Sequence, residues 1–294
     1  MIELKNINVS FGKHHVLRNL NETFESGEVI GLVAPNGTGK STLLNVMMNY
    51  LKPQSGEVVI EGSKKYKGPK ENSRIYQDIS MMPDQNDLYP HLSGYDHLKM
   101  YQDMYKRKNI SVDDVIKELE MGHYVKKKVS DYSLGMKQRL CFAMQMVSDT
   151  KIMLMDEVMN GLDPNNVELI SKVIIKKRDE GKTIVIASHL LENLEKYSNR
   201  IFFLFGGVLE LFLDKKQGYA DESTYIRLKG ISLEEATELF PDKYLVSLNE
   251  HGLVVRVEEK EQITKALEKL IAADMLEFSV GHLSLTDSYQ LIFY

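Results

Sequence analysis

A short glycine-rich run near the N-terminus constrains this chain more than any other feature of its sequence. It reads APNGTGKST at residues 34–42, after an apolar stretch at 28–33 and before residues 41–50, which continue at helical spacing. A strand, this loop and a helix form the context in which glycines turn backbone N–H groups around a phosphate. The run predicts a phosphate-binding loop, or Walker A motif. Its expected ATP-binding residues are Asn36, Gly37, Thr38, Gly39, Lys40, Ser41 and Thr42.

Two residues of this loop have definite expected roles. Lys40 should reach the β- and γ-phosphates, and the Ser41 hydroxyl should bind Mg²⁺, the cofactor expected beside ATP. The alternative is a glycine-rich start of a helix that binds no ligand. The strict pattern has glycine where this chain has Ala34, and we expect that change to be tolerated if φ there is negative.

Two further apolar runs end in polar residues. Residues 152–155 lead into Asp156 and Glu157, and residues 183–187 lead into Ser188 and His189. Apolar strands that alternate with helices favour an α/β fold with a parallel sheet, whose ligands bind at the carboxyl ends of the strands. The pattern predicts Asp156 as a Mg²⁺ ligand of a Walker B motif and Glu157 as the group that activates water. Solvated acids and a structural histidine are the alternatives.

Composition narrows the class of protein. The net charge of -5 and the even spread of Lys and Arg give no reason to expect a nucleic-acid partner. The single cysteine, Cys141, excludes an intramolecular disulfide and suits a reducing cytoplasm. The longest apolar run, 200–210, is far shorter than the ~20 residues of a bilayer span. We expect a cytoplasmic chain that reaches a membrane only through a partner.

The chain predicts two domains, 1–214 and 215–294. In the first, residues 2–24 should form two strands around a turn at Gly12 and Lys13, residues 52–57 a turn, residues 58–60 a strand, and residues 86–145 a mostly helical subdomain. In the second, strands are expected at 224–228, 244–248, 253–257 and 276–280, and helices at 233–239 and 261–273, with a hairpin turn at 249–252. That order is the βαββαβ order of a ferredoxin-like α+β domain.

With these residues together, the chain resembles the ATP-binding subunits of ABC transporters over residues 1 to about 210. Residues 9–12, VSFG, resemble the loop whose aromatic residue, here Phe11, stacks on adenine; a packed strand aromatic is the alternative. Residues 160–164, NGLDP, resemble the loop that crosses the dimer interface, with Asp163 in it. His189 matches the family's switch histidine, which the resemblance makes a catalytic residue beside Glu157.

Residues 132–139, YSLGMKQR, resemble the family's signature motif. The resemblance implies that this motif closes the ATP site of the opposite subunit. A serine and free N–H groups at a helix N-terminus suit a phosphate, although an ordinary helix cap has the same local structure. The implied contacts with the partner's ATP are Ser133, Leu134, Gly135 and Met136.

The sequence departs from the family pattern at three places. Leu134 and Met136 replace the usual glycine and glutamine of the signature, and Ala34 replaces the glycine of the phosphate loop. In the family's glutamine loop, Asp84 stands at the expected position and Gln85 follows it. Asp84 could still hold Mg²⁺ or water.

Among subfamilies, the motifs resemble those of exporters for bacitracin resistance, lantibiotic immunity and antimicrobial peptides. The resemblance implies a separate membrane permease and a homodimer or a heterodimer with a homologous ATP-binding subunit. The chain would then sit on the inner face of the cell membrane. Two alternatives stay open: a soluble ATP-driven factor that is not coupled to transport, and a regulatory subunit that does not hydrolyse ATP.

Overall fold

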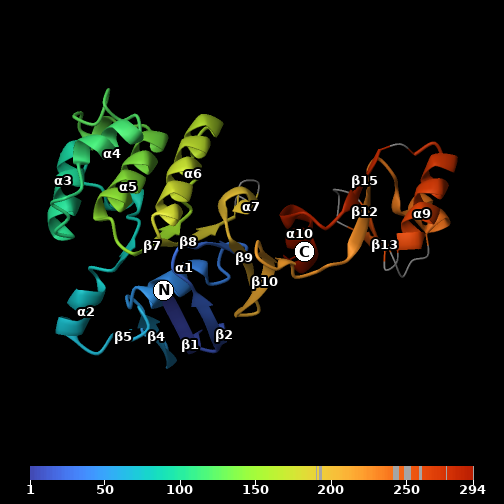
Figure 1. Cartoon of the computed structure of the whole chain (residues 1–294), viewed down its shortest axis with the longest axis horizontal. Coiled ribbons are helices and arrows are strands. Elements are labelled where there is room, and N and C mark those ends of the chain that lie inside the picture. Colours follow the sequence, from blue (N-terminus) through green and yellow to red (C-terminus); the bar gives the residue numbers. More distant parts are fainter. Residues whose placement is uncertain are drawn as a thin grey trace. The chain divides into compact units, whose positions relative to one another are not determined.

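The computed structural model describes residues 1–189, 191, 194–240, 245–247, 253–257, 260–275 and 277–293 (Figure 1). The chain forms two compact units, Met1–Glu210 and Leu211–Tyr294. The domain boundary that we propose from the sequence, after Asp214, falls at the last residue of β10 (Val208–Asp214).

The first unit is built on a parallel sheet, as expected. The strands of this sheet follow the order β11-β10-β9-β3-β8-β7-β6, in which β11 and the end of β10 already belong to the second unit. The pairs β3–β8, β3–β9, β7–β8 and β6–β7 are parallel. Every residue of β3 and β8 is buried, which explains why these strands are apolar throughout rather than alternating. The strands are β3 (Val29–Val33), β6 (Ile79–Met81), β7 (Ile152–Asp156), β8 (Thr183–Ser188), β9 (Arg200–Phe205), β10 and β11 (Gly218–Tyr219).

A second sheet of the first unit is antiparallel, in the order β2-β1-β4-β5. The predicted turn at Gly12 and Lys13 is confirmed, and it joins β1 (Ile2–Phe11) to β2 (His14–Phe24). The predicted turn at 52–57 extends too far, because β4 (Ser55–Ile60) already begins within it, ahead of β5 (Lys64–Lys65). Gly56 makes this early start possible: a Cβ there would lie 2.3 Å from the Asn6 carbonyl oxygen.

The predicted helical subdomain is confirmed. The helices α3 (Gly94–Met104), α4 (Val112–Glu118) and α5 (Leu134–Ser148) pack against one another and form one group in Figure 1. The remaining helical segments of this unit are α1 (Lys40–Met47), α2 (Pro69–Ile75), η1 (Gln85–Asp87), η2 (Val129–Asp131), α6 (Pro164–Asp179) and α7 (Leu194–Tyr197). Of the helices that the structure describes, none has the length and apolarity needed to cross a bilayer.

Local sequence fixes where α3, α4, α5 and α6 begin. The side chains of Ser93, Ser111, Ser133 and Asp163 each accept a hydrogen bond from the backbone N–H three residues ahead. Each therefore satisfies one of the N–H groups that a helix start leaves without an intrahelical partner. This is the reason that the signature motif forms the N-terminus of α5.

The second unit contains a four-stranded antiparallel sheet in the order β13-β14-β12-β15. Its elements follow the order expected from the sequence, but the proposed hairpin turn at 249–252 lies outside the described residues. A further helix, α10, ends the described part of the unit and was not predicted. The elements are β12 (Thr224–Leu228), α8 (Leu233–Leu239), β13 (Leu245–Ser247), β14 (Leu253–Val257), α9 (Lys260–Ala272), β15 (Phe278–Gly281) and α10 (Leu285–Phe293).

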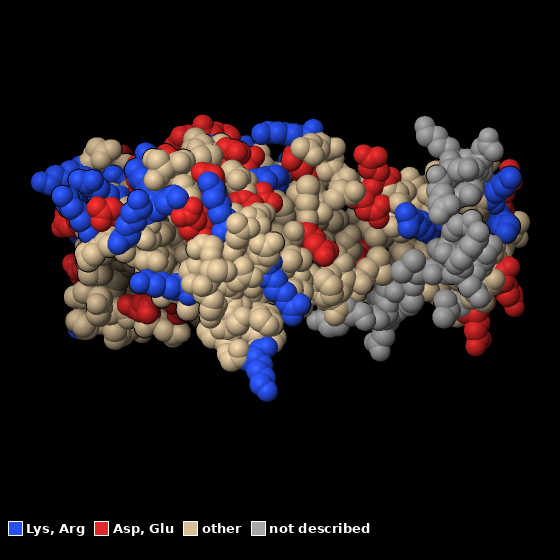
Figure 2. Space-filling model, turned by 90° about the horizontal axis from the view of Figure 1, so that it is seen from below, with Lys and Arg blue, Asp and Glu red and all other residues tan. Residues whose placement is uncertain are grey.

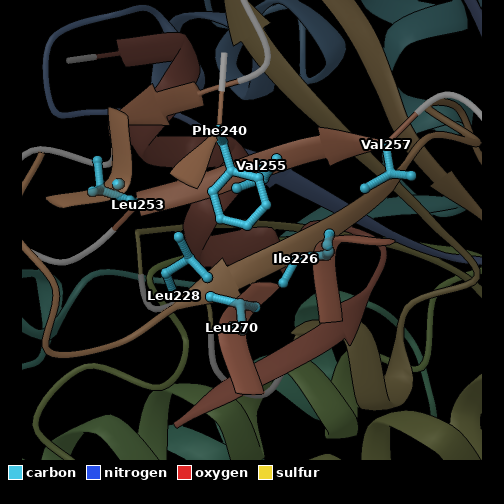
Figure 3. Packing of buried hydrophobic residues seen from close by; sticks show 9 residues of the cluster. Ile226, Leu228, Phe240, Leu253, Val255, Val257 and Leu270 are labelled. Atoms are coloured by element: carbon cyan, nitrogen blue, oxygen red, sulfur yellow. The ribbon is translucent and has the colours of Figure 1, made fainter. Parts of the chain in front are cut away.

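Alternating residues of this sheet face two different helical layers. Side chains of one face form a buried cluster with Phe240, Ala266 and Leu270. In Figure 3 the labelled side chains of this cluster, Phe240 and Leu270 among them, point toward one another. The other face places Tyr225 and Val254 against Leu291 of α10, and Arg227 forms an ion pair with the buried Asp287 of that helix. Burial on both faces follows from the period of two along each strand.

Candidate functional site: a split nucleotide site

The phosphate loop has the backbone that its glycines predict. Gly37 and Gly39 have φ of 83° and 116°, in the region that side chains disfavour. A Cβ on Gly39 would lie 2.6 Å from Cγ1 of Val16, so no larger residue fits there without a shift. Gly39 is also the N-cap of α1, so the loop ends at the positive end of that helix.

Lys40 lies inside this loop and is only 5% exposed. Its Nζ donates to the carbonyl oxygens of Ala34 (2.6 Å) and Pro35 (3.1 Å). Burial lowers the pKa of Lys40, and the negative charges of Glu157 and Asp156 oppose that shift. The ammonium group is therefore held next to the carboxyl ends of β3 and β7, where an anion would add a favourable charge.

The departure at Ala34 is accommodated by the fold. Ala34 is fully buried, and it is not among the described residues with positive φ. The condition under which we expect the change to be tolerated, a negative φ, is therefore met. A Cβ at this position therefore introduces no backbone strain.

Ser41 and Asp156 come together at the end of β7, although they are far apart in the sequence. The Ser41 hydroxyl donates to Oδ2 of Asp156 over 2.5 Å. Burial raises the pKa of Asp156, as does the nearby charge of Glu157, whereas the Ser41 hydrogen bond and Lys40 lower it. A hydroxyl beside a carboxylate that is unfavourably buried is a donor set that fits a hard cation.

Glu157 and His189, the two expected catalytic residues, also meet. Nδ1 of His189 lies 2.8 Å from Oε2 of Glu157. The other oxygen, Oε1, is buried, and no described residue forms a hydrogen bond with it. Glu157 has a φ of 50°, a left-handed backbone that costs a non-glycine residue about 1–3 kcal/mol. Its N–H donates to the Ala187 carbonyl (2.9 Å), which ties this backbone to β8.

Asp84 and Gln85 point to different partners. Asp84 caps η1, because its Oδ1 accepts from the Asn86 N–H over 2.8 Å. Its charge still contributes to raising the pKa of Asp156. Gln85, in contrast, donates from its Nε2 to the side chain of Gln138 in α5. The side chain that links this loop to the rest of the site is therefore that of Gln85.

The signature residues form a separate group. Ser133 caps α5 through the Met136 N–H, and Leu134 at the start of that helix is 62% exposed. Asp163 caps α6 through the Asn166 N–H, and this hydrogen bond is the main reason that the pKa of Asp163 is lowered. One cavity is lined by Ser133, Gly135, Met136, Gly161 and Asp163, together with Arg139 and others.

A second cavity is lined by the expected carboxylates and the glutamine loop. It contains Asp84, Gln85, Asp156 and Glu157, with Tyr50 and Tyr101 among its further residues. The two cavities share no lining residue. The expected catalytic and Mg²⁺-binding carboxylates and the expected signature contacts thus line different cavities of the same chain.

Phe11 ends β1, next to the turn of the β1–β2 hairpin, and is 55% exposed. The alternative of a packed strand aromatic is therefore wrong. An exposed ring at this place is free to stack on a planar ligand.

Sequence reasoning missed Gln138 as a functional candidate. This residue lies within the signature run, one position before Arg139. Nothing in the local pattern indicated that its side chain reaches the backbone that follows β7. Its Nε2 donates to the carbonyl oxygens of Glu157 and Val158, each over 2.9 Å.

A strand, a glycine-rich loop and a helix, with Asp156 and Glu157 at the carboxyl end of β7, a parallel strand of the same sheet, define a P-loop ATPase. The family model described as ABC transporter matches residues 17–160. The chain is 31% identical to the lantibiotic transport ATP-binding protein SrtF of Streptococcus pyogenes, over 74% of this chain and 91% of that protein. The chain therefore belongs to the ABC transporter family as an ATP-binding subunit, and it is an ATPase of the ABC type.

Two further similarities extend this result. The chain is 26% identical to the linearmycin resistance ATP-binding protein LnrL of Bacillus subtilis, over 97% of this chain and 92% of that protein. A solved dimeric structure of an ATP-binding cassette in a post-hydrolysis state, bound to ADP and Pi, has 27% identity and a TM-score of 0.64. The similarity covers 71% of this chain and 97% of the chain of that cassette.

Proposed function

We propose that two ATP-binding subunits, either two copies of this chain or this chain and a homologue, close around ATP and thereby power a separate membrane permease. The observation that carries the proposal is the division of the site between two cavities. A single chain offers Asp156 and Glu157 in one cavity, with Ser41 of the phosphate loop bonded to Asp156, and offers Ser133 with Gly135 in another. ATP held between Lys40 of one subunit and Ser133 of the other would join both halves, so its binding would favour the closed dimer.

The residues at the phosphate surface have complementary roles in this proposal. Lys40 binds the β- and γ-phosphates, Phe11 stacks on adenine, and His189 both orients Glu157 and donates to the γ-phosphate. Oε1 of Glu157 accepts a proton from the attacking water. The oxygen of that water bonds to the γ-phosphorus, and the bond between the γ-phosphorus and the ADP oxygen breaks.

Mg²⁺ fits the donor set that the structure presents. Ser41 and Asp156 would hold the ion, with Asp84 lining the same cavity as Asp156, and the ion would neutralise phosphate charge. Among the described residues, no cluster of three or more His, Cys, Asp and Glu is placed to bind a metal. Two protein oxygens suit Mg²⁺, which commonly keeps water and takes further ligands from phosphates.

We infer that the exported compounds are peptides or other antimicrobial molecules. The support lies in similarity to SrtF, named for lantibiotic transport, and to LnrL, named for linearmycin resistance. The second similarity also spans the C-terminal unit. The subunit would then be peripheral to the membrane, on its cytoplasmic face, because the permease anchors it.

The substitution Glu157→Gln tests the mechanism. It keeps the shape of the side chain but removes the base, so we expect ATP hydrolysis to fall by about 10²–10⁴-fold while ATP binding persists. Because ATP then remains in place, the variant should form a dimer with Mg²⁺-ATP that is detectable by size-exclusion chromatography. A normal rate of phosphate release in this variant would remove Glu157 from the mechanism.

A second experiment tests the link to transport. The affinity-tagged chain is purified from its native membranes with mild detergent, and bound proteins are identified by mass spectrometry. Recovery of a multi-span permease supports the proposal, whereas recovery of ribosomes supports the soluble factor. A permease complex that releases no phosphate would indicate the regulatory subunit.

A further inference from the structure

The amide of Gln138 joins three parts of the ATPase site. Gln138 lies on α5, past the signature residues, and is only 4% exposed. Its Nε2 donates to the backbone oxygens of Glu157 and Val158, and its Oε1 accepts from Nε2 of Gln85. One buried side chain thus contacts the backbone of the general base and the glutamine loop, and it belongs to the helix whose N-terminus carries Ser133.

Glu157 needs such support because its backbone is strained. The left-handed φ of 50° persists only where neighbouring groups fix the peptide units on both sides. The Ala187 carbonyl fixes the N–H side through β8, and Gln138 fixes the C=O side together with the Asn160 N–H, which donates to the same oxygen over 3.1 Å. Without Gln138, only the short local turn to Asn160 holds the C=O side, no group of α5 is attached to it, and the direction of the Glu157 side chain changes with its backbone.

We propose that Gln138 is a positioning residue for hydrolysis, which holds the Glu157 carboxylate in its reactive direction and couples that direction to the Gln85 loop and the signature helix. Movement of α5 or of the loop shifts the amide of Gln138 and, through it, the Glu157 backbone. The coupling concerns ATP hydrolysis alone and does not depend on which compound is transported.

The same helix provides a matched control. Gln145 is also a buried glutamine of α5, and it lies two turns further along. Its Nε2 donates to the Ser80 carbonyl over 3.3 Å. Substitution of Gln145 removes a buried amide from the same helix without touching the Glu157 backbone, so it measures the general effect of such a loss.

The test compares Gln138→Met with Gln145→Met in the full-length chain. Both changes replace an amide by an unbranched apolar side chain of similar length. The measurements are kcat and KM for ATP, the Kd of ATP and the thermal midpoint. We expect Gln138→Met to lower kcat by about 10–100-fold with a change of less than about threefold in the Kd of ATP, since a small misplacement of a reacting group has an effect of this size. Gln145→Met should change kcat by less than about threefold.

A double-mutant cycle separates positioning from a general structural role. Gln85→Ala should lower kcat in the natural chain but should have little additional effect in Gln138→Met, because the route from loop to base is already broken. If Gln138→Met does not fold, Gln138→Asn takes its place, since it keeps the amide but cannot reach both partners. The proposal is overturned if kcat is unchanged in the Gln138 variant, if both glutamine variants lower kcat equally, or if the two losses in the cycle are additive.

Discussion

Two glycines, one in each half of the ATP site, differ in what their own chain demands of them. Gly39 of the phosphate loop has a φ of 116°, and a Cβ there would press on Val16. Gly135 of the signature has no positive φ, and a Cβ there would meet the Gly161 oxygen at 3.4 Å and Leu162 at 3.8 Å. The fold requires the first glycine, whereas the second could be alanine with at most a small adjustment.

This difference separates a half that is shaped by its own chain from a half that is exposed. The phosphate half is held by contacts within one chain, because Lys40 is buried and its loop packs against β2. The signature half is presented outward, with Leu134 exposed at the start of α5. A small residue that the chain itself does not require is best explained by something that approaches from outside, and in our proposal this is the ATP of the partner subunit.

The largest effect should come from Gly39→Ala. Strain at this φ and the clash with Val16 should together reduce ATP affinity by about 100-fold or destabilise the loop by about 3 kcal/mol. Gly37 also has a positive φ, but no atom lies within 4 Å of an added Cβ. Gly37→Ala should therefore destabilise the loop by only about 1 kcal/mol. Calorimetric titration with ATP measures both. Partial rescue of Gly39→Ala by Val16→Ala would identify the clash, and equal effects at both glycines would contradict the explanation.

Gly135→Ala should separate the halves. We expect a thermal midpoint that is unchanged or slightly higher, because alanine is favoured over glycine in helices by about 0.5–1 kcal/mol. ATP binding to the single chain should be retained, but turnover should fall by about tenfold, because an added methyl displaces the incoming phosphate. Phosphate release measured against protein concentration tests this. Full activity of the variant would show that nothing approaches Gly135 closely.

The smallest effects concern two carboxylates, one from each half. The folded-state pKa of Asp156 is raised above its ordinary value of 3.8, so its contribution to stability is present at low pH and is lost as pH rises through that raised pKa. Without nucleotide and Mg²⁺, Asp156→Asn should therefore raise the thermal midpoint by about 2–4 °C at pH 7, and the gain should vanish near pH 4.

Asp163 should behave in the opposite sense. Its pKa is lowered by the Asn166 N–H, so its contribution is present at neutral pH and is lost as pH falls. Asp163→Asn should lower the midpoint slightly at pH 7, since asparagine is also a good cap. Thermal scans between pH 4 and pH 8 compare the two variants, and shifts of the same sign at pH 7 would refute the contrast.

The local patterns of the sequence predicted the elements of the first unit well. The buried strands ending in Asp156 and Ser188 and the loop around Lys40 are where their apolar runs and glycines indicate. The predictions failed where tertiary contacts, rather than the local sequence pattern, determine the structure. The early start of β4 depends on the close approach of Asn6 to Gly56. Helix α10 is rich in residues that also favour strands, and it is fixed by packing on Tyr225 and by the Arg227–Asp287 ion pair.

Figure 2 illustrates a further limit of sequence reasoning. Lys and Arg are interspersed with Asp and Glu on the visible face of the first unit, as the nearly neutral composition suggests. Composition gives the balance of charge, but it does not reveal which cavity a carboxylate lines. Asp84 and Gln85 are neighbours in the chain, yet the first caps a short helix and the second reaches α5.

The sequence by itself determined the chemistry of each half of the site. Glycines, a lysine and a hydroxyl in a fixed spacing specify a phosphate loop, because local backbone conformation and helix start depend on neighbouring residues alone. Only the tertiary structure decided that the Gln138 amide donates to the backbone of Glu157, that Gln85 donates to Gln138, and that the carboxylates and the signature residues line separate cavities. These facts depend on contacts between residues far apart in the chain, and local spacing carries no information about which distant side chains the packing of α5 against the sheet brings together.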